Sequence, residues 1–169
     1  STQTASSSST ISFTSGIDST YKEYIFKYIN IHPASAEHFT FQGSTDGGSS
    51  YGVTLTSTYF HAKHDEGDSS ASVAYVTGKD LAQSTSYQRL ADSLSTSADE
   101  STSGTLHLFN PSDTTFVKHF ISRSSVSNTE AKDGFVAGYF NTTSAIDAIQ
   151  FKMSSGNIDS GVIKLYGVS

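Results

Sequence analysis

Three short apolar runs separated by turn-forming residues fill the end of the chain, from Gly134 to Val168. Each run is rich in β-branched and aromatic residues and is bounded by Asn, Thr, Ser, Gly or Asp, which is typical of consecutive strands joined by tight turns. In the middle run Ile149, Phe151 and Met153 alternate with more polar residues, a period of two that favours a strand with one dry face. We therefore expect a β-meander to close the fold.

Similar alternation recurs upstream and predicts an all-β chain. Residues 21–32 read YKEYIFKYINIH, followed by Pro33, and are apolar or aromatic on both faces, which favours a long central strand over a helix. Further strands are expected at 10–14, 38–42, 51–63, 72–77, 105–109 and 115–123. With the terminal runs, this gives about ten strands, a pattern typical of an antiparallel β-sandwich or jelly roll.

Two segments depart from this pattern. Residues 1–10 read STQTASSSST, and we expect a flexible arm or one that orders only against a partner. Within residues 78–104, the apolar residues of 87–94 recur at helical spacing, which predicts one short helix or turn in a long loop. Residues 11–169 are then expected to form a single β-sandwich domain.

Composition excludes several classes of function. The formal net charge is −6, with ten Lys plus Arg scattered singly, which argues against nucleic-acid binding. No apolar run approaches the roughly 20 residues of a membrane helix, so no membrane partner is expected. Cysteine is absent, which excludes thiolate metal sites and disulfides.

The densest polar cluster is the candidate ligand or metal loop His64, Asp65, Glu66 and Asp68, together with His61. These are ligand types that divalent cations accept. However, His61 and His64 point to opposite faces of a strand, and the loop lacks the D-x-D-x-D-G order of a calcium site. A solvated strand end is the favoured interpretation, so neither a metal nor another cofactor is predicted.

Catalytic motifs are not evident. The nucleophile elbow G-x-S-x-G is absent, and most carboxylates fall in expected loops. Glu23 begins a strand, but no partner carboxylate can be identified. We therefore expect a protein that is not an enzyme.

Aromatic residues are the other candidate for function. Tyr24, Phe26 and Tyr28 share one face of the expected central strand. Because aromatics are enriched at subunit interfaces as well as in cores, we predict that these three lie at an interface, with the core as the alternative. A sugar-stacking platform made of Tyr24, Tyr28, Tyr59, Tyr75, Tyr139 and Tyr166 is a less favoured interpretation.

Several of these segments carry a family resemblance. The stretches IDSTYKEYIFKYINIHP, FQGSTDGGSSY, LHLFNPS and AGYFNTTSAIDAIQFKMSSGNIDSGVIKLYGV resemble small virion-associated β-sandwich proteins of tailed bacteriophages, notably those of marine bacteria and cyanobacteria. The resemblance covers nearly the whole chain. It implies a virion structural protein of jelly-roll type and brings no catalytic motif with it.

The resemblance leads to two hypotheses about the role of the chain in the virion. The first is a capsid decoration (cement) protein, expected to be a homotrimer that contacts the major capsid protein. The alternative is a tail-fibre or tail-tip module that binds host polysaccharide, for which loops 43–52, 64–70 and 124–134 are the candidate contact surface. A hydrolase of surface glycans is a third possibility.

Overall fold

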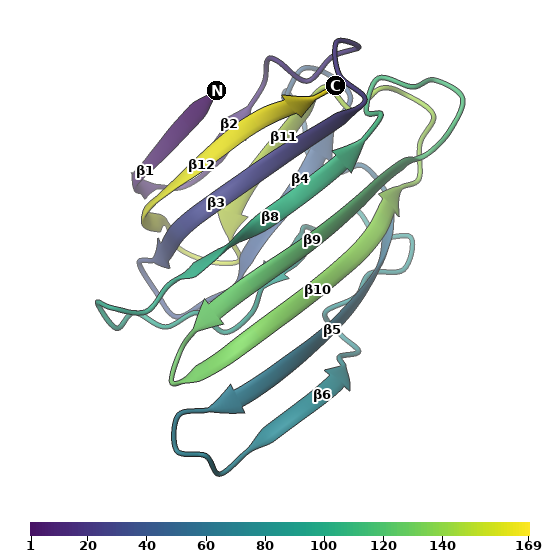
Figure 1. Cartoon of the computed structure of the whole chain (residues 1–169). Helices are drawn as coiled ribbons and strands as arrows, with labels where there is room; N and C mark the ends of the chain where they lie inside the picture. The colour runs from purple at the N-terminus through teal and green to yellow at the C-terminus, as the bar shows by residue number, and fades with distance from the viewer.

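The computed structural model describes all 169 residues and contains twelve strands and no helix (Figure 1). It therefore has no helix that could cross a membrane. The strands are β1 (Thr2–Ser8), β2 (Ile11–Phe13), β3 (Glu23–Pro33), β4 (Phe39–Ser44), β5 (Leu55–Asp65), β6 (Ala71–Tyr75), β7 (Gln88–Ala91), β8 (Thr102–Phe109), β9 (Lys118–Ser127), β10 (Glu130–Phe140), β11 (Ala148–Met153) and β12 (Ile158–Val168). The all-β prediction is confirmed.

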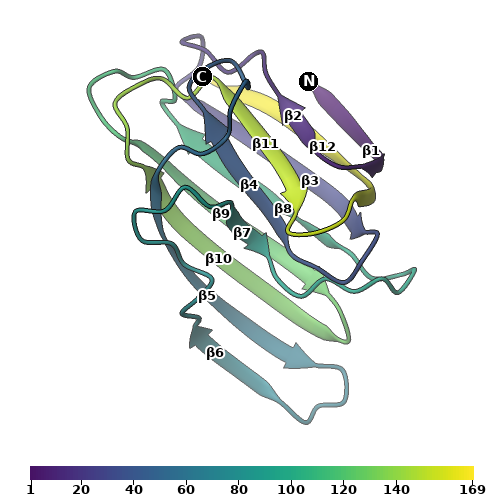
Figure 2. The ribbon, with the colours of Figure 1, turned by 180° about the vertical axis from the view of Figure 1, so that it is seen from behind.

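Two antiparallel sheets of unequal size form the sandwich. The larger has eight strands in the order β1-β12-β3-β8-β9-β10-β5-β6, and the smaller has four in the order β2-β11-β4-β7. Seen from behind, the smaller sheet covers the β12, β3 and β8 half of the larger one, β7 lies over β9 and β10, and β5 and β6 extend beyond it (Figure 2). One face of the larger sheet therefore carries the core, and no strand covers the other.

The three terminal strands exist, but they do not form the predicted meander. β10 pairs with β5 and β9, β11 pairs with β2 and β4 in the smaller sheet, and β12 pairs with β1 and β3. The chain crosses between the sheets after β10 and again after β11. The predicted dry face of β11 is confirmed, because Ile149, Phe151 and Met153 are buried while Gln150 and Lys152 between them are partly exposed.

A cluster of aromatic rings fills the space between the sheets. The Phe151 ring stacks on Phe39 with centroids 5.6 Å apart and meets Phe26 edge-on at 5.4 Å. Phe13 lies edge-on to both Phe26 and Phe151. Edge-to-face and stacked pairs of this kind add to the stabilisation from burying the rings.

Tyr24, Phe26 and Tyr28 belong to this core, which corrects the interface prediction. At most 1% of each is exposed, so no surface remains for a partner chain. The reason is topological: β3 is an inner strand of the larger sheet, and its aromatic side faces the smaller sheet. Burial is tolerated because the Tyr24 hydroxyl bonds to Asp18 and the Tyr28 hydroxyl lies 3.2 Å from the Ser122 hydroxyl.

The segment 87–94, predicted as a helix or turn, contains no helix, and its residues 88–91 form strand β7. β7 pairs with β4 at the edge of the smaller sheet, and Leu90 and Ala91 are buried. The Gln88 side chain is buried too, and it donates to the carbonyl of Lys79 at 3.0 Å and accepts from the Ser57 hydroxyl. Sheet pairing therefore overrides the local helical spacing.

The N-terminal segment is part of the sheet, which corrects the prediction of a flexible or partner-ordered arm. β1 pairs antiparallel with β12 from Thr2 to Ser8, and Ala5 is buried. The N-terminal amine also donates to the carbonyl of Leu165 at 2.9 Å. Pairing through the backbone needs no apolar side chains. The Ser/Thr-rich sequence of residues 1–10 therefore carries no alternating pattern that would reveal this strand.

Deletion of residues 1–8 is expected to lower the free energy of unfolding by roughly 1–3 kcal/mol, the usual range for a destabilising change. It should also promote aggregation, because it exposes the unpaired edge of β12. Chemical denaturation and light scattering would measure both effects. An unchanged unfolding curve and a monodisperse sample would show that β1 contributes nothing to the fold.

Candidate functional site

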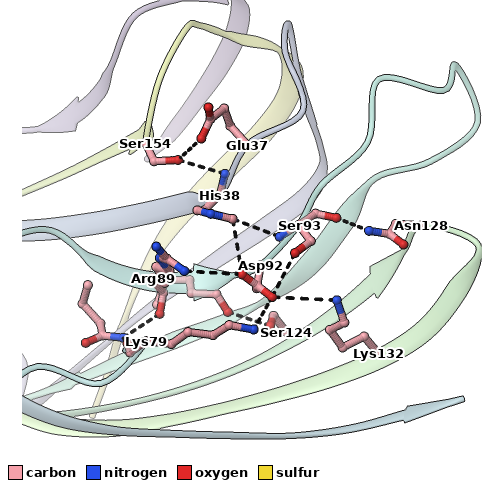
Figure 3. A network of polar contacts seen from close by, with 12 residues as sticks. Glu37, His38, Lys79, Arg89, Asp92, Ser93, Ser124, Asn128, Lys132 and Ser154 are labelled. Carbon is pink, nitrogen blue, oxygen red and sulfur yellow. Dashed lines mark hydrogen bonds and ion pairs between the residues drawn. The ribbon is translucent and has the colours of Figure 1, made fainter. Parts of the chain in front are cut away.

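The densest group of charges lies between the sheets, at the end of β7 (Figure 3). Asp92 is 3% exposed. Lys79 donates to its carboxylate, and Arg89 Nη1 and Lys132 Nζ approach it at 3.6 and 3.9 Å. His38 Nδ1 lies 3.3 Å from the same carboxylate. One buried carboxylate is therefore the shared counter-ion of three cations.

The electrostatics of this cluster fit a structural role. Burial alone would raise the pKa of the Asp92 carboxyl, but the hydrogen bond from Lys79 and the charges of Lys79 and Lys132 outweigh burial and keep that pKa below its usual range. Burial, reinforced by Arg89, lowers the pKa of His38, and its Nδ1 accepts the backbone N–H of Ser93 at 3.0 Å. Neutral His38 therefore accepts from the backbone of Ser93, and the ionised Asp92 carboxylate accepts from Lys79 and from the Ser93 hydroxyl.

The Asp92 carboxylate at the centre of the cluster is almost fully buried, while Arg89 and His38 at its border stay partly exposed. Of the larger hollows of the surface, only the one of about 600 Å³ is lined by a member of the cluster, Lys132, and none is lined by Asp92, Lys79, Arg89 or His38. The nearby Tyr59 hydroxyl and His61 Nδ1 are buried without a hydrogen-bond partner, but none of these hollows reaches them. We therefore assign the cluster to the core.

Of the candidate ligands His64, Asp65, Glu66 and Asp68, only His64 and Asp68 contact each other through their side chains. They lie at the turn between β5 and β6, where Asp65 accepts the backbone N–H of Ser69 at 2.8 Å and His64 Nε2 lies 3.1 Å from Asp68. No group of three or more ligand-type side chains anywhere in the chain could hold a metal ion. The Asp65 carboxylate instead holds the backbone of its own turn.

The uncovered face of the larger sheet, which faces the viewer in Figure 1, carries a different constellation. On β9, Phe120 and Ser122 are buried and the alternating Ile121 and Arg123 point outward. Antiparallel register aligns such outward positions of neighbouring strands into a row across the sheet. One such row, called the outer row below, consists of Tyr75, Phe60, Phe135, Arg123, Thr105, Lys27 and Lys164, which are successive partners from β6 to β12.

The aromatic half of the outer row is held in a fixed geometry. The rings of Phe60 and Phe135 stack with centroids 4.7 Å apart and planes within 4°. The Arg123 guanidinium lies over the Phe135 ring, 5.0 Å from its centroid. Asp133 accepts from Arg123 Nε at 2.9 Å and from Nη2 at 2.6 Å. Arg123 is thus positioned by both a ring and a carboxylate, and its Nη1 donors are left for other contacts.

Hollows flank the outer row on both sides. The first, about 440 Å³ in volume, has Ile121 and Ala137 beside Phe60, Phe135 and Arg123. The second, about 600 Å³, lies on the other side of Arg123 and is lined mostly by residues of polar or charged type, such as Ser103, Thr105 and Asp133. Both hollows arise because large side chains of the row stand next to small ones on the neighbouring rows, such as Ala137 and Ala62.

Several large apolar side chains are exposed on or beside the row. The exposed fractions are 41% for Phe60, 53% for Tyr75, 47% for Ile121 and 77% for Val73. Single exposed apolar residues are common, but a contiguous group of them beside a hollow marks an interaction surface. We therefore take the outer row and its hollows as the candidate binding site.

Sequence reasoning missed this site. The expected strands at 51–63 and 115–123 and the first apolar run after Gly134 contain Phe60, Arg123 and Phe135, but the predicted contact surface consists of loops. Aromatic residues at alternating positions of these strands are a signal that the sequence shows. The register that aligns them across neighbouring strands cannot be deduced from the sequence.

Comparisons with known proteins do not identify the chain. No protein-family model matches it, and no curated protein matches it significantly. Among solved structures, it is similar to the marine PL-14 alginate lyase from Aplysia kurodai, with a TM-score of 0.29 and 10% identity over 88% of this chain and 71% of that one. It is also similar to CG-16, a homodimeric agglutinin from chicken liver, with a TM-score of 0.22 and 12% identity over 98% and 100% of the two chains. Likenesses this weak carry no functional argument.

Proposed function

We propose that the chain is a non-enzymatic structural module of a bacteriophage virion that binds host surface polysaccharide through the outer row. The observation that carries this proposal is the row itself: rings and a positioned guanidinium stand together on a sheet face that no strand covers. Placement in a virion rests on the family resemblance of the sequence.

The outer row has the features that bind sugar rings. A pyranose presents C–H groups on one face, which suit the electron-rich face of an aromatic ring. Its hydroxyls lie at the rim, where the Arg123 donors, the Asp133 carboxylate and the Thr105 hydroxyl stand beside the rings. An apolar platform with a few polar groups at its edge is the general form of a small-molecule site.

The carboxylates of this face are better placed for binding than for cleavage. Glycoside hydrolysis needs a pair of carboxyl groups that are free to act as acid and as nucleophile or base. Asp133 is bound by Arg123, and Glu23 lies 2.6 Å from His107 Nδ1. The Asp133 and Glu23 carboxylates are thus engaged by Arg123 and His107 on the same face. The proposal is therefore for a module without hydrolase activity.

A capsid decoration protein is the second candidate, and one observation favours it. The edge strands β1 and β6 of the larger sheet contain neither charged residues nor proline, the usual protection against pairing with another chain. Pairing of these edges would produce a homo-oligomer, such as the expected trimer, on the capsid surface.

Two measurements test the proposed function. Affinity electrophoresis in gels that contain polysaccharide from the host surface should retard the purified chain. Immunogold labelling should place it at the tail of the particle. Labelling over the capsid faces in many copies, together with unretarded migration, would instead support the decoration protein.

A further inference from the structure

The second half of the outer row differs chemically from the first. After the rings of Tyr75, Phe60 and Phe135, the row continues with Arg123, Thr105, Lys27 and Lys164. Arg123 and Lys27 are exposed and Lys164 is partly exposed. The only carboxylate that contacts these three cations is Asp133, at Arg123. A protein with a formal net charge of −6 thus carries a cationic stretch on its uncovered face.

The length of the row indicates the form of the ligand. Neighbouring strands lie about 4.8 Å apart, so the six steps from Tyr75 to Lys164 span about 29 Å. A small anion would contact only one or two of these side chains. An extended polymer that lies across the strands would meet the rings at one end and the cations at the other.

From this arrangement we infer that the ligand is a linear anionic polysaccharide, whose sugar rings stack on Phe60 and Phe135 and whose carboxylate or sulfate groups pair with Arg123, Lys27 and Lys164. The inference rests on the proposed function. It adds the chemical class of the polymer and the way it lies, across the strands of the larger sheet. A single-stranded nucleic acid also combines rings with negative charge, but its dense phosphates need more cations than this row offers, on a protein of the same sign.

Affinity electrophoresis with polygalacturonate, a linear polyuronate, tests the inference, with uncharged dextran and poly(dT) as comparison polymers. The double variant Lys27→Gln/Lys164→Gln should raise the polygalacturonate concentration for half-retardation at least tenfold, and its retardation should depend less on salt. The control is Lys152→Gln: Lys152 lies over the Tyr87 ring at 4.4 Å, as Lys27 lies over Tyr166 at 5.5 Å, but on the smaller sheet. Thermal unfolding of each variant checks that it is folded.

The outcomes separate the two proposals. Selective retardation by polygalacturonate that only the double variant loses supports the inference. Equal retardation by dextran, or tighter binding of poly(dT), would overturn the anionic polysaccharide, and the dextran result would leave polysaccharide binding intact. An unaffected double variant would overturn the role of the lysines. If no polysaccharide, including that of the host, retards the wild-type chain, both proposals fail.

Discussion

Replacement of Asp92 by alanine is expected to lower the free energy of unfolding by about 3–5 kcal/mol, the usual cost of removing one partner from a buried ion pair. The substitution leaves Lys79, Arg89 and Lys132 facing one another without their shared carboxylate. Chemical denaturation measures the change. The control is Asp68→Ala, whose side chain is 91% exposed, and a loss as small as that of the control would contradict the structural role of Asp92.

The same carboxylate predicts part of the acid sensitivity of the protein. Its pKa in the folded protein is below the value of 3.8 expected for an unfolded chain. The ionised Asp92 carboxylate therefore contributes its full stabilisation above the unfolded pKa of 3.8. This stabilisation is lost as the pH falls from there through the lower pKa of the folded protein. Stability measured from pH 6 to pH 2 should fall below about pH 4, and it should fall less steeply in Asp92→Asn. Parallel curves for the two proteins would contradict this assignment.

The second large effect concerns binding. The double variant Phe60→Ala/Phe135→Ala should weaken polysaccharide binding at least 30-fold, which corresponds to about 2 kcal/mol and is typical of an aromatic hot spot. Folding should be largely retained, because both rings lie on the uncovered face and not in the core. Affinity electrophoresis and thermal unfolding measure the two properties.

A matched control exists for this variant. Phe116, 69% exposed, lies in the loop between β8 and β9 and outside the outer row, so Phe116→Ala should bind as the wild type does. Equal loss in the control and the double variant would show that general surface apolarity, and not the row, governs binding.

Alternation along the chain predicted most strands because burial on one face leaves a period of two in the sequence. It could not predict which strands pair. The runs that contain Phe135, Phe151 and Leu165 are consecutive in the sequence, yet each lies beside strands from distant parts of the chain. Consecutive strands are neighbours in only about two-thirds of cases, so the expected meander was a reasonable but wrong default.

The side-chain pattern also failed to predict features that depend on backbone pairing or on the register between distant strands. The Ser/Thr run at Thr2–Ser8 is held as β1 by hydrogen bonds to β12, which composition does not reveal. The outer row joins residues from Lys27 to Lys164 through six pairings. A shift of one residue in any of them would turn that strand's row residue to the opposite face. Burial of Tyr24 and Tyr28 likewise depended on which face of β3 the smaller sheet covers.

The most direct test of the outer row as the binding site is a ¹H–¹⁵N NMR titration of the chain with polygalacturonate oligomers. The account predicts that shift changes concentrate on β5, β8, β9 and β10 around Phe60, Thr105, Arg123 and Phe135, and continue through β3 and β12 to Lys27 and Lys164. Changes confined to loops 43–52, 64–70 and 124–134 would contradict it, as would the absence of any change.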